Sequence, residues 1–173
     1  KPAFGESAEG RKEKRPVLGA NTICAKGIKR AGIGVVGLAN NHIMDHGKEG
    51  FDSTIEALRA VGIEYVGAGK SIVEASQMLI KEINSIKLGI VAVAEHEFSI
   101  ANKHSAGANP LDVIAFARNM ARYRNAVDFV IVLFHGGKEL HPYPSPRQMD
   151  ICRFMVEQGA SAVICQLLIT LLF

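Results

Sequence analysis

The segment GVVGLANNHIMDHG, residues 34–47, joins a short apolar run to a polar turn. Residues 34–38 predict a buried strand of a parallel sheet. Ligands of such sheets bind outside the carboxyl ends of the strands, and Asn41 and His42 follow this strand directly. An amide oxygen and an imidazole at that place can reach a metal ion or a phosphate. Asn and His are also ordinary turn residues, so the tripeptide alone leaves a site and a plain turn both open.

Strands and helices alternate along the rest of the chain, which predicts an α/β fold. Right-handed crossovers would place four strands in one largely parallel sheet. These strands are 34–38, 63–66, 127–134 and 161–165. Two more runs, 78–83 and 87–93, predict a hairpin that turns at Asn84-Ser85. Five helices are predicted. Four of them span residues 21–31, 72–77, 110–125 and 146–158, the last with Ser145 as N-cap. The other has Ser53 and Glu56 as a capping box and ends at Gly62.

Two further polar groups follow predicted strands. The run VDFVIVLF, residues 127–134, is the clearest buried strand and places His135 at its carboxyl end. Glu95-His96-Glu97 follows the strand of residues 87–93. Alternate carboxylates around an imidazole suit a metal or a substrate, and they equally suit a surface charge cluster. Both interpretations of this cluster stay open.

The segment around Asn41 resembles the CapA-type poly-γ-glutamate capsule-synthesis family, and the resemblance runs from about Pro16 to Gln166. The matching residues are Leu38–His42, Asp45, Gly47, Thr54, Leu58, Gly62, Val66–Gly69, Pro144, Gln148 and Gly159–Ile164. Residues 135–139, HGGKE, look like the family's His-Trp-Gly-x-Glu, with Gly136 in place of Trp. The family's N-terminal Gly-Asp and Asn-Leu-Glu motifs and its C-terminal His-x-His motif have no counterpart. We therefore expect residues 1–173 to be a single partial domain, incomplete at both ends.

The resemblance implies a layered α/β sandwich with a largely parallel central sheet, like that of the calcineurin-like metallophosphoesterases, and a site with divalent metal ions (Mn, Fe, Zn or Mg). It implies Asn41 and His135 as metal ligands, His42 as the catalytic proton donor, and Asp45 as the residue that orients His42. Residues implied to line the site are Asn40, Glu95, His96, Glu97 and Glu139. Two side chains are fewer than the about four to six donors that a divalent ion takes, so we expect this piece to be nearly inactive.

Two functions from different classes fit this resemblance. The first is a metal-dependent phosphoesterase-like hydrolase of capsule or poly-γ-glutamate biosynthesis, acting on a small molecule or an anionic polymer. The second is a non-catalytic protein that binds an anionic polymer or assists its export. Members of the family are often associated with the cell envelope. The missing flanking motifs are the feature that separates the two functions.

Composition limits the partners. The chain carries a net charge of +3, and residues 1–30 hold eight Lys and Arg against three Glu. The basic run of residues 11–15 has no aromatic residues and is interrupted by Glu13, so it favours a solvated loop over a nucleic-acid site. We expect residues 1–20 to be an irregular basic lead-in and residues 167–173 an atypical apolar tail. No apolar run reaches the roughly 18 residues of a membrane span, so we expect a soluble piece, of open oligomeric state.

The three cysteines, Cys24, Cys152 and Cys165, are isolated and lack CxxC spacing. This spacing argues against a disulfide framework or a zinc knuckle. Cys152 falls on the apolar side of a predicted helix and Cys165 in a predicted strand. We therefore expect both to be buried, inert thiols.

Overall fold

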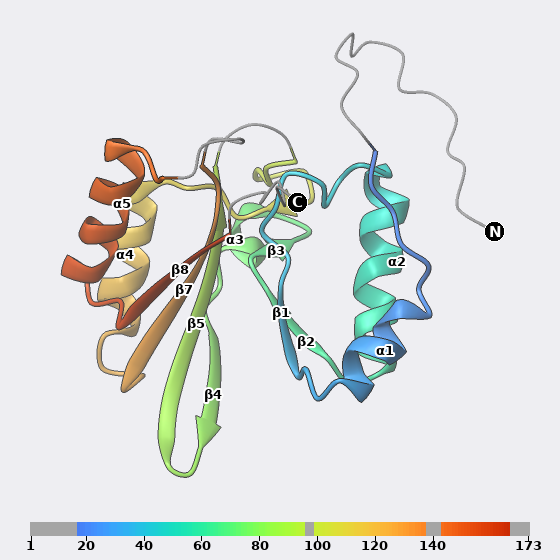
Figure 1. The fold of residues 1–173 in the computed structure, drawn as a ribbon, viewed down its shortest axis with the longest axis horizontal. Coiled ribbons are helices and arrows are strands. Elements are labelled where there is room, and N and C mark those ends of the chain that lie inside the picture. The colour runs from blue at the N-terminus through green and yellow to red at the C-terminus, as the bar shows by residue number, and fades with distance from the viewer. Residues whose placement is uncertain (1–16, 96–98, 138–142, 167–173) are drawn as a thin grey trace, which may run out of the picture.

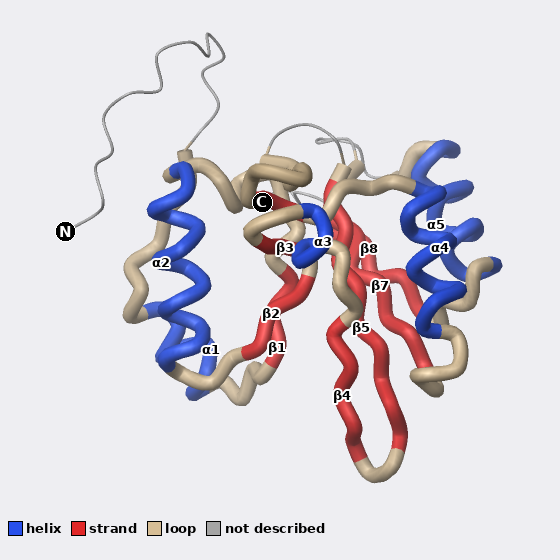
Figure 2. Tube along the Cα trace, turned by 180° about the vertical axis from the view of Figure 1, so that it is seen from behind, coloured by secondary structure: helices blue, strands red, loops and turns tan. Residues whose placement is uncertain are grey.

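The computed structural model describes residues 17–95, 99–137 and 143–166 (Figure 1). Two sheets face each other in the middle of the molecule, and helices cover the outer side of each (Figures 1 and 2). The smaller sheet lies beside helices α1 and α2, and the larger sheet lies beside α4 and α5. The expected α/β sandwich is confirmed. Within the described ranges, no helix has the length and apolar character that a bilayer crossing requires.

The smaller sheet contains two parallel strands, β1 and β2, which pair in the register Val35↔Glu64. The four elements of this half are α1 (Cys24–Arg30), β1 (Val35–Gly37), α2 (Gly47–Ala60) and β2 (Glu64–Val66). The inner side of α2 places Phe51, Ile55 and Leu58 in a buried apolar cluster with Leu38. This cluster fixes the strand that leads into the polar turn.

Helix α2 corrects one expectation. It begins at Gly47, whose φ of +62° suits glycine, so Ser53 and Glu56 lie inside the helix and form no capping box. The pattern Ser-x-x-Glu also occurs within helices, and it marks a start only where the backbone leaves the helix. The end of the helix before Gly62 is as expected.

The larger sheet has the order β4-β5-β7-β8. Its strands are β4 (Leu79–Ile83), β5 (Ile86–Ala94), β7 (Phe129–His135) and β8 (Ala162–Gln166). Strands β5, β7 and β8 are parallel, and β4 pairs antiparallel with β5. Asn84 and Ser85 have φ of 51° and 66° and form the two-residue turn between β4 and β5, as the sequence predicted.

Helices α4 (Val113–Tyr123) and α5 (Pro146–Glu157) cover one face of this sheet. Val130, Val132 and Phe134 alternate along β7 and face these helices within the main buried cluster. Helix α4 begins at Val113, where Asp112 accepts hydrogen bonds from the backbone of residues 114 and 115. The expected start at Pro110 is therefore wrong by three residues. Helix α5 has the expected Ser145 cap, whose side chain accepts from the Gln148 amide.

The expectation of one sheet is wrong, because β1 and β2 form a sheet separate from β7 and β8. Small residues allow the two sheets to pack closely. A Cβ on Gly37 would lie 2.9 Å from Leu133 Cδ1, and a Cβ on Gly67 would lie 2.5 Å from that of Ala92. Three short elements lie near the end of the sandwich at which β1 and β7 finish. They are β3 (Ala68–Gly69), α3 (Ile72–Ala75) and β6 (Gly107–Ala108). The close packing brings the carboxyl end of β1 near that of β7.

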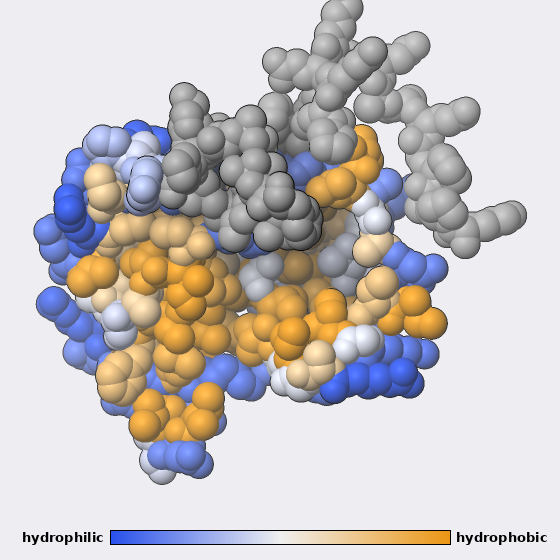
Figure 3. All heavy atoms as spheres, in the orientation of Figure 1, coloured by the Kyte–Doolittle hydropathy of each residue, from blue (hydrophilic) through white to orange (hydrophobic). Residues whose placement is uncertain are grey.

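The other face of the larger sheet is only partly covered by the described residues. Figure 3 shows apolar side chains gathered over the strands on the face toward the viewer. Large apolar side chains that are exposed on these strands include Ile83, Ile86, Phe129 and Ile164. Strand β8 pairs with β7 along one edge, and no other described strand pairs with it.

Candidate functional site

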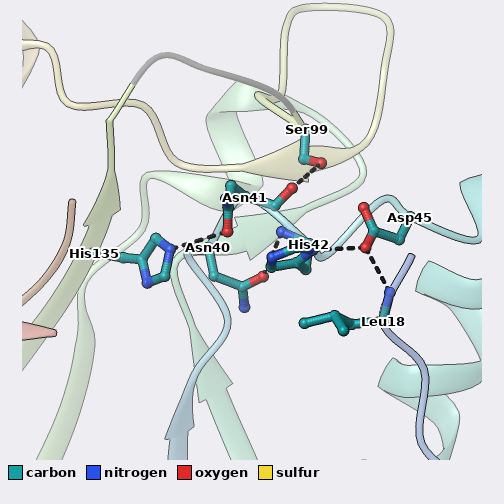
Figure 4. Close-up of polar contacts among 7 residues, drawn as sticks. All are labelled: Leu18, Asn40, Asn41, His42, Asp45, Ser99 and His135. Carbon is teal, nitrogen blue, oxygen red and sulfur yellow. Dashed lines mark hydrogen bonds and ion pairs between the residues drawn. The ribbon is translucent and has the colours of Figure 1, made fainter. Parts of the chain in front are cut away.

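The polar turn after β1 is shaped by Asn40. Its side-chain oxygen accepts from the His42 amide at 2.9 Å (Figure 4). Its side-chain nitrogen donates to the Leu38 carbonyl at 3.3 Å. This Asx turn uses both ends of the Asn40 carboxamide within the loop itself. Asn40 therefore holds the backbone that presents Asn41 and His42.

His42 and Asp45 form a partly buried pair beside the turn. Nδ1 of His42 lies 2.7 Å from Oδ2 of Asp45, whose side chain is 1% exposed. The Leu18 backbone amide donates to the same carboxylate oxygen at 2.9 Å. Because a carboxylate accepts, the proton on this side of the imidazole ring is on Nδ1. Nε2 is then the ring nitrogen that can exchange a proton with another molecule.

Asn41 and His135 meet across the two sheets. The Oδ1 atom of Asn41 lies 3.1 Å from Nε2 of His135, which is the last residue of β7 (Figure 4). Ser99 supports this contact, since its hydroxyl donates to the Asn41 carbonyl at 2.9 Å. The structure thus brings together two residues that the sequence placed at the carboxyl ends of two separate strands.

A small cavity of about 130 Å³ lies next to His135. Its walls are mainly apolar, and its polar side chains are His135 and Gln166. The apolar part comes from Gly37, Ala39, Ala92, Leu133, Phe134 and Ile164. The imidazole of His135 therefore lies between the Asn41 amide and a space in the gap between the sheets.

The Asn41–His135 contact fits two ligands of one divalent ion. Donors about 2.1 Å from an ion, in neighbouring positions of its coordination shell, lie about 3 Å apart, and these two atoms are 3.1 Å apart. In the part of the chain that the structure describes, no group of three or more His, Cys, Asp or Glu side chains is placed to hold a metal. The described residues thus bring together two side chains, Asn41 and His135, whose types could serve as metal donors.

The family model of the bacterial capsule synthesis protein PGA_cap matches residues 2–167. The chain belongs to this family. The resemblance predicted from the polar turn and the HGGKE segment is therefore confirmed. The PGA_cap match includes both strands that carry the candidate site and both helices that cover the larger sheet.

Two curated proteins are similar to this PGA_cap chain. The capsule biosynthesis protein CapA of Bacillus anthracis is 28% identical over 158 residues, which cover 88% of this chain and 38% of the relative. The PGA biosynthesis protein CapA of Bacillus subtilis is 29% identical over 156 residues, which cover 88% of this chain and 41% of the relative. The chain thus spans about two fifths of the length of the curated relatives it matches.

A solved structure shares the fold. A Staphylococcus aureus protein, provisionally named a 5'-nucleotidase and solved in complex with alpha-ketoglutarate, matches with a TM-score of 0.52. The match covers 86% of this chain and 34% of that protein, at 12% sequence identity. At this identity the likeness concerns the fold alone, and it agrees with the layered α/β sandwich expected for a PGA_cap chain.

In this PGA_cap chain, Glu95 follows β5 and lies beside the end of β7, where its backbone amide donates to the His135 carbonyl at 3.0 Å. One carboxylate oxygen accepts from the Gly137 amide at 2.8 Å and the other from Arg147 at 2.8 Å. A Cβ on Gly136 would lie 2.6 Å from Glu95 Cγ, so this glycine leaves the space in which the carboxylate lies. Glu95 therefore connects the loop after β7 with the start of α5. His96, Glu97 and Glu139, also expected to line the site, lie outside the described residues.

Two residues that contribute to the site were not predicted from the sequence. Ser99 holds the Asn41 carbonyl from a left-handed backbone conformation with φ of 65°, which is uncommon outside glycine. Leu18 contributes only its backbone amide to Asp45. A single sequence carries no signal for a backbone donor, and a lone serine in a polar stretch is too common to stand out.

Proposed function

We propose that the chain carries part of a divalent-metal-dependent, phosphoesterase-like site that acts in capsule or poly-γ-glutamate biosynthesis. The observation that carries the proposal is the 3.1 Å contact between Asn41 and His135, which join from separate sheets beside the His42–Asp45 pair. The named activities of the two CapA relatives support the biosynthetic setting. The substrate is then a small molecule or an anionic polymer.

Asn41 and His135 would hold the metal. The amide oxygen of Asn41 is a hard neutral donor, and Nε2 of His135 binds a metal ion once it has lost its proton. In the protein alone, Nε2 of His135 donates this hydrogen to Oδ1 of Asn41. When bound, Mn, Fe, Zn or Mg would polarise the oxygens of the ester and lower the pKa of an attacking water. The further donors of the ion must come from residues other than these two.

His42 would give a proton to the leaving oxygen. Asp45 fixes the ring through Nδ1, so Nε2 presents its proton in one direction and the ring does not need to rotate during the reaction. The Asp45 side chain is almost completely buried, which restricts its movement. Asp45 is thus a positioning residue, because it acts on the substrate only through His42.

Titration calorimetry with Mn²⁺ tests the ligand assignment without an activity assay. Asn41→Ala and His135→Ala should each weaken Mn²⁺ binding by about 10–100-fold, whereas His42→Ala should leave the affinity within about twofold. His104→Ala is a matched control, because His104 is exposed and outside the site. Equal weakening in all three site variants would contradict the division of roles.

The second function, polymer binding without catalysis, predicts a different experimental result. Binding of fluorescent poly-γ-glutamate that persists in EDTA and in Asn41→Ala, together with no ester hydrolysis by the natural full-length protein, would replace the phosphoesterase proposal. Polymer binding that requires Mn²⁺ and both ligand residues would instead place the polymer at the proposed site.

A further inference from the structure

Cys152 and Cys165 lie side by side on two different elements. Their sulfur atoms are 3.5 Å apart, with Cys152 in α5 and Cys165 in β8. The expectation that both are buried is wrong, since Cys152 is half-buried and Cys165 is exposed. Side chains two positions apart on a strand face the same side of the sheet. Val163 packs in the same cluster as Cys152, so Cys165 also faces the helix.

Among the described residues, strand β8 has few other attachments. It pairs with β7 in the register Leu133↔Ile164, and no other described strand pairs with its far edge. Ile164 is 54% exposed, so the side of β8 away from α5 contributes little burial. The contact with α5 is therefore an important constraint on this strand beyond its ladder with β7.

We propose that Cys152 and Cys165 are a modification site, at which a reversible disulfide fastens β8 to α5. The oxidant is a disulfide, either a small molecule such as oxidised glutathione or an exposed protein disulfide. A disulfide bond is about 2.05 Å long, so the two sulfurs must approach each other by about 1.5 Å. Rotation about the Cα–Cβ bonds of the two side chains would supply this movement.

The exchange proceeds in two balanced steps. The Cys165 thiolate attacks one sulfur of the oxidant, forms a mixed disulfide and releases one thiolate. Cys152 then loses its proton to water and attacks the Cys165 sulfur, which releases the second thiolate and closes the protein disulfide. The two cysteines are oxidised, and the oxidant is reduced to two thiols. Burial and the hydrogen bond with Cys165 raise the pKa of the Cys152 thiol to about 11, which makes exposed Cys165 the first attacking group.

Mass spectrometry after equilibration in oxidised and reduced glutathione tests the pairing. We expect the folded protein to lose two hydrogens, a peptide digest to contain the 152–165 cross-link, and Cys24 to remain reduced or carry glutathione alone. Cys152→Ser should stop at the first step and retain one glutathionyl group on Cys165. A folded protein that accumulates glutathione on Cys165 without the cross-link would overturn the proposal.

Thermal unfolding tests the fastening of β8. The loop closed by the bond is short, and we expect oxidation to raise Tm by about 5–10 °C. Dithiothreitol should reverse the increase. Cys24→Ser, the matched control, should keep the shift, whereas Cys152→Ser and Cys165→Ser should lose it. Since the shift is measured in the unaltered protein, it does not depend on the folding of a variant. A cross-linked protein with an unchanged or lower Tm would exclude the fastening role.

Discussion

Asn41 and His135 are 94 positions apart in the sequence and lie in different layers, yet their side chains are 3.1 Å apart. One follows a strand of the smaller sheet and the other ends a strand of the larger sheet. The contact exists because both strands run toward the same end of the sandwich and because small residues allow the sheets to pack closely. The roles proposed for this site lead to the following expectations.

His42→Ala in the natural full-length protein should lower ester turnover by about 10²–10⁴-fold, because it removes a positioned proton donor. The melting temperature should change little, since a partly exposed loop side chain supports no core. Steady-state kinetics with a phosphodiester and Mn²⁺ provide the measurement, with His104→Ala as control. Full activity in His42→Ala would remove this residue from the mechanism.

Leu18→Pro should lower turnover by about 10-fold, since proline has no amide hydrogen to donate to Asp45. Leu18→Ala retains the backbone donor and should have nearly normal kcat. A lower kcat in Leu18→Pro than in Leu18→Ala, with the same Mn²⁺ affinity in both, would indicate that Asp45 acts by positioning His42. Equal activities of the two variants would show that the Leu18 amide is dispensable.

Gly67→Ala should destabilise the protein by about 2–4 kcal/mol. The residue has φ of +85°, and an added Cβ would lie 2.5 Å from the Ala92 Cβ and 2.9 Å from the Ala92 carbonyl oxygen. Gly34→Ala is the matched control, because no atom lies within 4 Å of its added Cβ. Urea unfolding of both variants gives the comparison. A loss for Gly67→Ala below about 0.5 kcal/mol would contradict the close packing of the sheets.

Alkaline pH should destabilise the reduced protein through Cys152. Burial raises the pKa of this thiol from 9.0 to about 11 in the folded state. The folded state therefore keeps the proton that the unfolded state loses, so this contribution to stability is complete below pH 9 and disappears as the pH rises toward 11. Tm measured with a reductant across this range should fall less steeply in Cys152→Ser. Parallel curves for the two proteins would exclude the linkage.

The 173-residue chain by itself should hydrolyse a generic phosphodiester or phosphomonoester at most weakly with Mn²⁺. Its described residues place two donors together and contain no group of three or more His, Cys, Asp or Glu for a metal. Turnover equal to that of an intact relative, and abolished by His42→Ala, would show that the site needs fewer ligands than we propose.

Local patterns predicted much of the fold. Apolar runs gave the strands that precede Asn40 and His135, and the Asn84-Ser85 turn and the Ser145 cap followed from their residue types. The separation of β1 and β2 from the larger sheet could not be predicted in this way. A short run such as residues 34–38 indicates burial, but the sheet that it joins depends on contacts between distant segments, such as that of Gly37 with Leu133, which exist only in three dimensions.

Part of the candidate site could also be predicted from local sequence patterns. Asn41, His42 and His135 stand at strand ends, where sequence alone marks them as candidates. The bonds made by Asn40, Ser99 and the Leu18 amide depend on loop geometry. The exposure of Cys165 was missed because the apolar sequence of β8 indicates burial and does not reveal that no other described strand pairs with its far edge.

The geometry of the candidate site depends on the packing between the two sheets that carry Asn41 and His135. Asn41 belongs to the half whose core contains Phe51 and Ile55, and His135 follows Phe134 in the core of the other half. Between them lies a third buried cluster in which four of the five fully buried members are alanines, so each buries less apolar area than the large side chains of either core. A partial opening between the sheets would separate the two donors while both halves stay folded. Metal affinity would then report how firmly the halves are docked, and substitutions far from either donor could tune it.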